Sequence, residues 1–383
     1  MPYLLRDLAL THSNIGVFDR QNVRRLDPVL SLLVLSLIVV GLAVLTSASR
    51  NVSSSIPYYY AAKQVVWFLV GAGCAVLLVC VDYRFLVSLA PGMYALVVGL
   101  LIVVLLWGIE VKGGQRWLTL GLVRFQPSEL GKIVLVYTLA WYFSVLQERI
   151  RRLPYFLLTF VIVGIPMLLI LKQPNLGTAA SLIPVVFVML YAAGCKRWHL
   201  AVVILLGLVA APLAWSQLKD YQKDRIRSFL NAEADPQDTG WHTIQTKITV
   251  GSGGMWGKGF REGTQTHLSY LPEHHTDFIF ALLAEEEGFV GAVAILGLFA
   301  VFLLRGLMLA RDCPDLSGSM LAVGVVTILG FHVFVNVGIT IGLLPVTGLP
   351  LPFLSYGGSF CLTTMVGVGT LLSVQVRKGF FRT

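Results

Sequence analysis

Long hydrophobic segments alternate with short polar segments along this chain. Ten apolar segments can be counted, at residues 28–47, 64–81, 86–107, 128–147, 154–171, 177–194, 200–216, 278–304, 319–340 and 357–376. Each is close to the roughly 20 residues that an α-helix needs to cross a hydrocarbon layer of about 30 Å. A lipid-exposed segment must satisfy its backbone hydrogen bonds internally, so each should be helical. The pattern predicts an all-α integral membrane protein with about ten transmembrane helices.

The composition agrees with a chain that faces lipid. Of its 383 residues, 56% are hydrophobic and only 13% are charged, whereas a soluble domain carries about 25% charged residues. The net charge of +9 would suggest a nucleic-acid partner for a soluble protein. In a membrane protein, Lys and Arg on the cytoplasmic side set the topology and contact anionic lipids. No nucleic-acid partner is therefore expected.

The basic residues also predict the orientation. With a cytoplasmic N-terminus, fifteen Lys and Arg residues lie in inside segments, seven in short outside loops and span ends, and seven in one long outside loop. Cytoplasmic loops carry the excess of Lys and Arg, and long loops are discounted because they cross the membrane whatever their charge. Both termini are thus expected in the cytoplasm.

One long segment, at about residues 217–275, separates the seventh and eighth apolar segments. Loops of this length in compact proteins are usually functional or disordered. Aromatic and aliphatic residues such as Trp241, Trp256 and Phe260 argue against full disorder. We predict a single polytopic domain over residues 1–383, with this segment as its one large extracytoplasmic loop.

The cysteines and histidines point to no metal chemistry. The five cysteines show no CxxC motif and no Cys/His ligand spacing, so neither a disulfide framework nor a zinc site is predicted. The seven histidines are scattered, and the neighbours His274 and His275 would point apart on a helix. No metal site is predicted, and whether a divalent cation acts as a cofactor is left open.

Ionisable groups at membrane depth are costly, so each is a candidate functional residue. Glu129 and Lys132 lie in FQPSELGK at the outer end of the fourth span, where the spacing i, i+3 places them on one helix face. A structural ion pair that lets both enter the membrane is one interpretation. The other is that Glu129 holds Lys132 ready for an anionic substrate.

Arg116 and Trp117 lie in VKGGQRW, just before that span. The planar guanidinium suits phosphate, whereas Trp favours the interface between water and lipid. An interfacial Trp beside an incidental Arg is therefore the alternative to a substrate site. Four basic residues cluster on the outer side, where the topology disfavours them: Lys112, Arg116, Arg124 and Lys132. This clustering favours the substrate site.

Asp277 lies where the polar LPEHHTDF segment enters the eighth span, after Thr276, a candidate N-cap. An Asp in the first helical turn could merely compensate the helix dipole. Glu285, Glu286 and Glu287 follow soon after, so part of this helix is expected in a water-filled cavity rather than in lipid. A carboxylate there, facing clustered basic residues, would suit a general base that acts on a sugar hydroxyl beside a diphosphate.

Two further segments are weaker candidates. GSGGMWGKG, which contains Lys258, is similar to an anion-cradling glycine loop, but it lacks the GKS or GKT ending and the preceding strand of a nucleotide site. LPLPFLSYGGS, before the last span, is typical of a broken or re-entrant segment that lines a cavity.

Together these segments resemble the RodA/FtsW (SEDS) family of shape, elongation, division and sporulation proteins. The resemblance covers essentially the whole chain and is carried by GGQRW, FQPSELGK, QPNLGTA, GSGGMWGKG, EGTQTHLSYLPEHHTDFIFALLAEE and LPLPFLSYGGS. The GTQTHLSYLPEHHTDF stretch favours the elongation member over the division member. One position departs from the family, because its usual QPDLGT has Asn175 in place of Asp, which puts a catalytic role there in doubt.

The resemblance implies a ten-span peptidoglycan glycosyltransferase of the bacterial inner membrane, with its active site facing outward. It would polymerise lipid II onto an undecaprenyl-linked glycan chain during cell elongation and maintenance of the rod shape. The implied partner is a class B penicillin-binding protein that supplies transpeptidation. Further partners would belong to the elongation complex, including an actin-like scaffold and its membrane adaptors.

The resemblance also implies roles for single residues. Asp277 matches the family's catalytic aspartate. Three residues match polar cavity residues that the family needs for activity: Arg116, Glu129 and Lys132. Together with Trp117 and Lys258, these three are the candidates for substrate binding.

The implied reaction begins when Asp277 removes the proton from the glucosamine 4-hydroxyl of the acceptor. The resulting oxygen attacks the anomeric carbon of the donor with inversion. Arg116, Lys132 and Lys258 would stabilise the charge on the leaving undecaprenyl diphosphate.

Two other functions compete with this interpretation. A transporter that flips lipid II would explain the ten spans, the internal charges and the broken segment. Against it, no inverted repeat is visible and the polar residues gather at the outer face, not at the midplane where transporters bind. A non-catalytic scaffold for the transpeptidase would leave the outer charge cluster unexplained.

Overall fold

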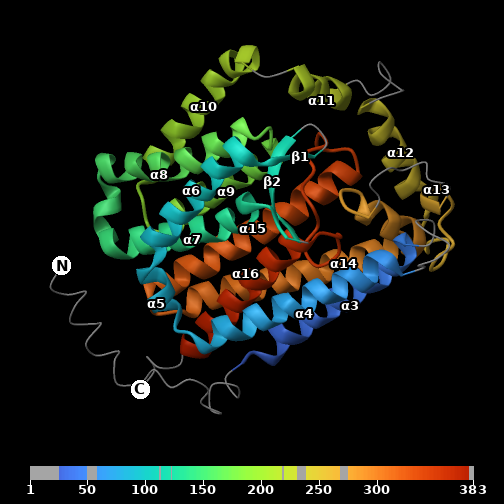
Figure 1. Cartoon of the computed structure of the whole chain (residues 1–383), viewed down its shortest axis with the longest axis horizontal. Helices are drawn as coiled ribbons and strands as arrows, with labels where there is room; N and C mark the ends of the chain where they lie inside the picture. Colours follow the sequence, from blue (N-terminus) through green and yellow to red (C-terminus); the bar gives the residue numbers. More distant parts are fainter. Residues whose placement is uncertain are drawn as a thin grey trace.

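The computed structural model describes residues 26–49, 58–111, 114–121, 123–217, 220–230, 239–267 and 275–378. Most of them form a bundle of helices (Figure 1). Within these ranges, ten apolar helices are α3 (Pro28–Ala48), α4 (Tyr59–Cys80), α6 (Ala90–Trp107), α7 (Pro127–Leu146), α8 (Leu153–Lys172), α9 (Leu176–Ala192), α10 (Arg197–Gln217), α14 (Ile279–Asp312), α15 (Leu316–Thr340) and α16 (Gly358–Arg377). Each covers one predicted apolar segment, and the predicted helical membrane fold is confirmed. By length and composition, eight of the ten can cross a membrane, and α9 and α10 contain shorter apolar helices.

Several of these helices begin at residues that cap them. The Asp27 carboxylate accepts from the Val29 N–H at 2.9 Å at the start of α3, and Asp315 begins α15 in the same way. Asn175 caps α9 by accepting from the Thr178 N–H at 3.3 Å. Asn and Asp cap helices about equally well. Asn175 therefore begins α9 as well as an Asp at this position would.

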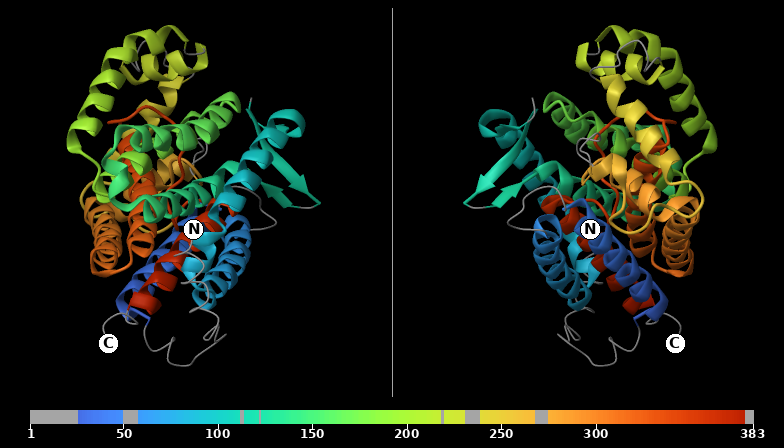
Figure 2. Two further views of the ribbon diagram at one scale, coloured as in Figure 1. Left: turned by 90° about the vertical axis from the view of Figure 1, so that its left-hand side faces the viewer. Right: turned by 90° about the vertical axis from the view of Figure 1, so that its right-hand side faces the viewer.

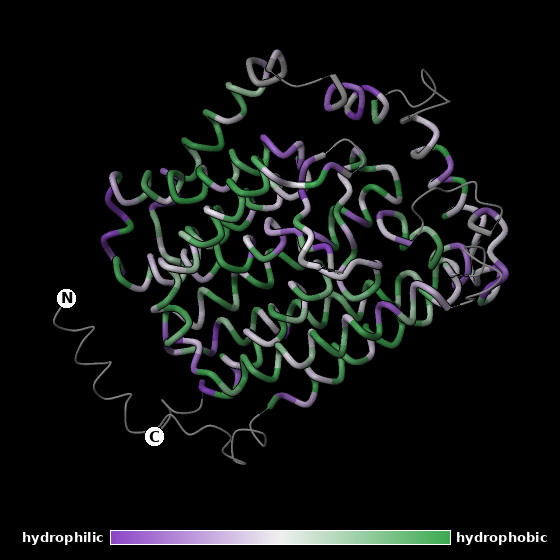
Figure 3. Tube along the Cα trace, viewed as in Figure 1, coloured by the Kyte–Doolittle hydropathy of each residue, from purple (hydrophilic) through white to green (hydrophobic). Residues whose placement is uncertain are grey.

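The helices divide into a buried centre and an outer layer. In their apolar windows, 78% of the α16 residues and 72% of the α15 residues are buried, against 22% in both α4 and α6. The fourth span, α7, is also mostly buried. Hydrophobic residues follow the helices, and hydrophilic ones gather mainly near their ends and connections (Figure 3). Polar side chains of α7, α15 and α16 can therefore be held by protein rather than by lipid.

A small antiparallel sheet connects α6 to α7, and the sequence did not predict it. Its strands are β1 (Ile109–Val111), β2 (Gly114–Leu120) and β3 (Val123–Phe125), in the order β1-β2-β3. Glu110 pairs with Gln115, and Thr119 pairs with Arg124. The sheet projects from one side of the helix bundle (Figure 2). The all-α prediction therefore holds for the spans but not for this connection.

Short helices complete the described chain: α5 (Tyr83–Ser88), the 3-10 helix η1 (Gln147–Arg151), α11 (Asp220–Leu230), α12 (Thr239–Ser252) and α13 (Thr264–His267). The predicted segment 86–107 is thus divided, with α5 ending just before α6. Three of the short helices lie in the long segment between α10 and α14. Because α12 packs against α14 and α15, part of that segment lies against the bundle.

A kink in α14 was also not predicted. Gly288 has φ 67° and ψ −169°, which interrupts the helix. The carbonyls of Glu285 and Glu286, just before the kink, accept from the N–H groups of Lys258 and Gly259, each at 3.0 Å. These two N–H groups are therefore used in hydrogen bonds to α14 and are not directed at an anion site.

The same glycine-rich segment also binds the other side of the kink. The Phe289 and Val290 N–H groups donate to the Gly254 and Met255 carbonyls at 2.9 and 3.1 Å. Gly257 has φ +78°, and a Cβ atom there would lie 2.0 Å from the Glu286 carbonyl oxygen. Only glycine fits such a close approach at a positive φ. The glycines of GSGGMWGKG therefore let a loop replace the hydrogen bonds that α14 loses at its kink.

Candidate functional site

Lys132 is fully buried in the first turns of α7 and has two polar partners. Its Nζ atom lies 2.9 Å from Glu129 Oε2 and 2.9 Å from His332 Nε2 of α15. The ammonium also lies 5.3 Å from the centroid of the Phe360 ring. The predicted Glu129–Lys132 pair is present, and His332 joins it as a third member that the sequence did not suggest.

Asp277 lies in a turn before α14 rather than in the first turn of that helix. The helix begins at Ile279, its N-cap position is Phe278, and no side chain caps it. The expectation that Thr276 is the N-cap is therefore wrong, and Asp277 lies just outside the helix rather than in its first turn. Asp277 is half-buried, and a Cβ atom on Gly348 would lie 3.7 Å from its Oδ2 atom. The carboxylate thus faces the segment that precedes α16.

The main chain of Asp277 is fixed by Asn336 of α15. The Asn336 side-chain amide donates to the Asp277 carbonyl at 2.9 Å and to the Leu349 carbonyl at 2.9 Å. On the preceding residue, the Thr276 carbonyl accepts from Ser355 Oγ at 2.6 Å. The turn that carries the carboxylate is therefore bonded both to α15 and to the segment before α16.

The same turn is packed against an aromatic cluster. The Tyr356 N–H donates to the His275 carbonyl at 2.9 Å, and the His275 ring stacks on Tyr60 with 4.1 Å between the ring centroids. Burial raises the pKa of the Tyr356 hydroxyl.

The broken segment predicted from LPLPFLSYGGS connects α15 to α16 without regular helix. We call residues 341–357 the α15–α16 connector. Its residues Leu349, Leu351, Phe353, Leu354 and Ser355 are buried. Irregular backbone at membrane depth is tolerated only where protein or a water-filled cavity surrounds it. Burial in protein satisfies this condition.

Arg116 reaches the connector indirectly. Its Nε atom donates to the Gln173 carbonyl at 3.1 Å, and its Nη2 atom donates to the Pro174 carbonyl. These carbonyls belong to the turn between α8 and α9, and Gly177 just beyond it lies so close to the connector that a Cβ atom would be 2.6 Å from the Thr347 oxygen. The guanidinium fork therefore holds the main chain of QPNLG against the connector.

Trp117 lies on β2, where it pairs with Ile109 across the sheet. The side chain is half-buried.

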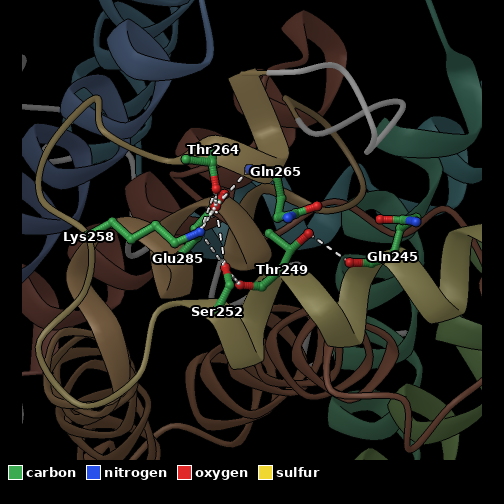
Figure 4. Close-up of polar contacts among 7 residues, drawn as sticks. All are labelled: Gln245, Thr249, Ser252, Lys258, Thr264, Gln265 and Glu285. Atoms are coloured by element: carbon green, nitrogen blue, oxygen red, sulfur yellow. Dashed lines mark hydrogen bonds and ion pairs between the residues drawn. The ribbon is translucent and has the colours of Figure 1, made fainter.

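Lys258 lies in a separate cluster at the kink of α14 (Figure 4). Its Nζ atom is 2.7 Å from Glu285 Oε1, 2.9 Å from Ser252 Oγ and 2.7 Å from Thr264 Oγ1. The Gln265 N–H donates to the same carboxylate oxygen at 2.8 Å. Lys258 therefore neutralises a fully buried carboxylate.

The neighbouring Glu286 is also enclosed in protein. Its carboxylate accepts from the Ser47 hydroxyl of α3, and both Glu285 and Glu286 are buried. A water-filled cavity at the start of α14 therefore does not contain Glu285 or Glu286, whereas Glu287 is exposed. Protein side chains from α3, α12 and the glycine-rich segment solvate the two buried glutamates instead.

Two residues of the site were missed in the sequence, His332 and Asn336. Both are fully buried in α15 and lie four residues apart, on one helix face. The available signal was a pair of polar residues inside an otherwise apolar span, where polar groups are costly. In the ranges that the structure describes, no group of three or more His, Cys, Asp and Glu side chains could hold a metal ion.

Known proteins match the chain over almost its whole length. A family model described as Cell cycle protein (FTSW_RODA_SPOVE) matches residues 27–379. The peptidoglycan glycosyltransferase MrdB of Escherichia coli (strain K12) is 37% identical over 356 residues, which cover 92% of this chain and 94% of that protein. The probable peptidoglycan glycosyltransferase FtsW of Trichlorobacter lovleyi is 37% identical over 361 residues, which cover 91% and 93%.

Solved structures share the fold. A chain from the structure described as "Structural coordination of polymerization and crosslinking by a peptidoglycan synthase complex" matches with a TM-score of 0.80 at 33% identity, covering 94% of this chain and 99% of that one. The crystal structure of the rod shape determining protein RodA of Thermus thermophilus matches with a TM-score of 0.68 at 34% identity, covering 91% and 96%.

Proposed function

Because the chain belongs to the FtsW/RodA/SpoVE family of cell cycle proteins, we propose that it polymerises lipid II into the glycan strands of peptidoglycan. The predicted family and enzyme class, a peptidoglycan glycosyltransferase, are confirmed by relatives that cover more than nine tenths of the chain. One observation carries the assignment of the site. Asn336 joins the main chain of Asp277 to the Leu349 carbonyl. His332 joins the Lys132 ammonium to the carbonyl of the next residue, Pro350.

In the proposed reaction, Asp277 is the general base. It takes the proton of the glucosamine 4-hydroxyl on the acceptor, and the oxygen forms a bond to the anomeric carbon of the donor. The bond from that carbon to the diphosphate breaks, and undecaprenyl diphosphate leaves with inversion at carbon. A half-buried carboxylate at the edge of the bundle can reach a sugar in water while the lipid tails stay in the bilayer. General base catalysis contributes about 10²–10⁴ in rate.

Positive charge near the leaving group supplies the second part of the proposed mechanism. Lys132 is fully buried and paired with Glu129, so in this proposal its positive charge acts on the departing diphosphate through the protein rather than by direct contact. Fixed charges in a water-poor site act strongly because they need no reorganisation during the reaction. Arg116 orders the QPNLG turn beside the connector, and Trp117 on strand β2 is the proposed substrate contact from the sheet. Lys258 is assigned to the fold, because it neutralises Glu285.

The proposed location is the bacterial cytoplasmic membrane, with both termini inside and the site facing outward. The helices make the chain a multi-pass membrane protein, and the excess of basic residues on one side supports the orientation. Residues 1–383 then form one polytopic domain whose segment 217–275 lies outside.

The proposed partner is a class B penicillin-binding protein that crosslinks the new strands. It is supported by the likeness to a chain from a peptidoglycan synthase complex that coordinates polymerization and crosslinking. Other proposed partners are the components of the elongation complex, including an actin-like scaffold and membrane adaptors. Neither a cofactor nor a metal has a part in the steps above.

The experiment that tests the function uses the purified full chain with its transpeptidase partner in lipid. Labelled lipid II is added, and the products are separated by length on a gel. The proposed enzyme forms long glycan strands that a muramidase digests. A lipid II flippase would instead move labelled substrate across vesicles without forming polymer, and a scaffold would do neither.

A further inference from the structure

Two buried polar side chains of α15 lie one helical turn apart, and each contacts a different part of the site. His332 and Asn336 are both fully buried, and a spacing of four residues places them on one face. Polar groups inside a membrane helix are costly and tend to be retained for function.

The hydrogen bonds of His332 fix its tautomer. A lysine ammonium has donors only, so His332 Nε2 must accept from Lys132 at 2.9 Å. The proton of the neutral ring then lies on Nδ1, which donates to the Pro350 carbonyl at 3.0 Å. The ring also stacks on Phe360 at 4.7 Å between centroids. His332 thus joins the Lys132 ammonium to the connector, and its ring has no freedom to turn without breaking one bond.

Asn336 makes the corresponding link to Asp277. Its amide nitrogen has two hydrogens, and both are used, one on the Asp277 carbonyl and one on the Leu349 carbonyl. Its buried oxygen Oδ1 has no hydrogen-bond partner among the described residues. Leaving such an atom unpaired costs about 1–3 kcal/mol. The position therefore carries an amide for its two donors, despite the cost of its oxygen.

We propose that His332 and Asn336 are positioning residues of the transferase site, which set Lys132 and the Asp277 turn at a fixed distance along α15. Leu349 and Pro350 are adjacent in the chain, and each of the two side chains binds one of their carbonyls. The helix and the connector thereby form one rigid frame for the proposed leaving-group cation and the proposed base. This inference rests on the proposed function.

Two substitutions at His332 separate its two hydrogen bonds. His332→Gln can place an acceptor oxygen near the position of Nε2 and so keep the bond from Lys132. His332→Asn can place a donor near the position of Nδ1 and so keep the bond to Pro350, while Lys132 loses its acceptor on residue 332 and keeps only Glu129. Both variants remove the ring and its stacking on Phe360, so each is the matched control of the other for stability.

The expected difference is in turnover. With labelled lipid II and the partner present, His332→Gln should keep kcat within about threefold of the parent. His332→Asn should lower kcat by about 100-fold with little change in KM, because a misplacement of about 1 Å in a catalytic group costs on that order. Both melting temperatures should be below that of the parent, since each variant loses the ring and one hydrogen bond, so kcat is measured per mole of folded protein. Asn336→Asp, which is isosteric but lacks both donors, should lower kcat in the same way.

Each other result overturns the inference. Equal activity of the two His332 variants, whether high or low, would show that the acceptor for Lys132 does not matter. Failure of both to fold would make His332 a structural residue only. A parent chain that binds lipid II but forms no polymer would refute the proposed function itself, and the positioning roles would fall with it. If Asn336→Asp does not reach the membrane, the comparison of His332→Gln with His332→Asn still tests the positioning role.

Discussion

Lys132 Nζ lies 2.9 Å from Glu129 Oε2, and neither side chain is open to solvent. Removing one member of a buried ion pair leaves the other charge uncompensated, at about 3–5 kcal/mol. Lys132→Ala should therefore lower both the melting temperature and the yield of protein, besides abolishing polymerisation.

A double substitution separates these two effects. Glu129→Gln with Lys132→Met keeps similar shapes without charge, so it should restore the melting temperature. It should not restore polymer, because the cation for the diphosphate is still missing. Stability is measured by thermal unfolding in detergent and activity with labelled lipid II. A double variant that polymerises at the parent rate would show that the pair serves only the fold.

Arg116 makes two bonds to main-chain carbonyls of one turn, which requires the planar fork of a guanidinium. Arg116→Lys keeps the charge but loses the fork. We expect polymerisation to fall at least about tenfold, since the turn beside the connector loses its fixed place. Arg124→Lys is the control, because Arg124 is exposed on the neighbouring strand. Parent-like activity of Arg116→Lys would mean that the positive charge alone is needed.

Lys258 Nζ lies 2.7 Å from the buried Glu285 carboxylate. Lys258→Ala should destabilise the protein by about 3 kcal/mol, because it leaves that carboxylate unpaired. Adding Glu285→Gln removes the buried charge and should recover both the melting temperature and most of the activity. If the double variant regains stability but stays inactive, Lys258 contacts the substrate after all.

The proposed orientation is testable by labelling in whole cells. In a chain whose five cysteines are replaced, a single cysteine at Trp256, which is 80% exposed, should react with an impermeant thiol reagent from outside. One at the exposed Arg151 should react only after the membrane is opened. The reverse pattern would place the glycine-rich segment, and with it the outer clusters, on the cytoplasmic side.

The transmembrane helices could be predicted from the sequence, because each apolar segment must satisfy its own backbone hydrogen bonds in lipid. The small sheet between α6 and α7 escaped prediction, because its strands of three, seven and three residues are too short for a periodic signal. The kink at Gly288 escaped too, since its partners lie in a loop some thirty residues earlier. Hydropathy therefore locates helices but not the bonds made where a helix is interrupted.

The candidate site shows the same limit. Glu129 and Lys132 could be paired from their spacing on one helix, because that contact is local. His332 is 200 residues from Lys132 in the chain, and only the packing of α7 on α15 brings them together. Likewise, Lys258 and Glu285 are 27 residues apart in the chain, and only the fold brings their charges together. Local spacing predicts which charges can pair, whereas long-range packing decides which do.

The most direct test of the mechanism is the polymerisation rate of purified Asp277→Asn with the transpeptidase partner. Asn is nearly isosteric, and the main-chain bond from Asn336 to residue 277 does not depend on the side chain, so the variant should fold and bind lipid II. It cannot accept a proton at neutral pH, and the rate should fall by about 10²–10⁴. Polymer formed at close to the parent rate would contradict the assignment of Asp277 as the general base.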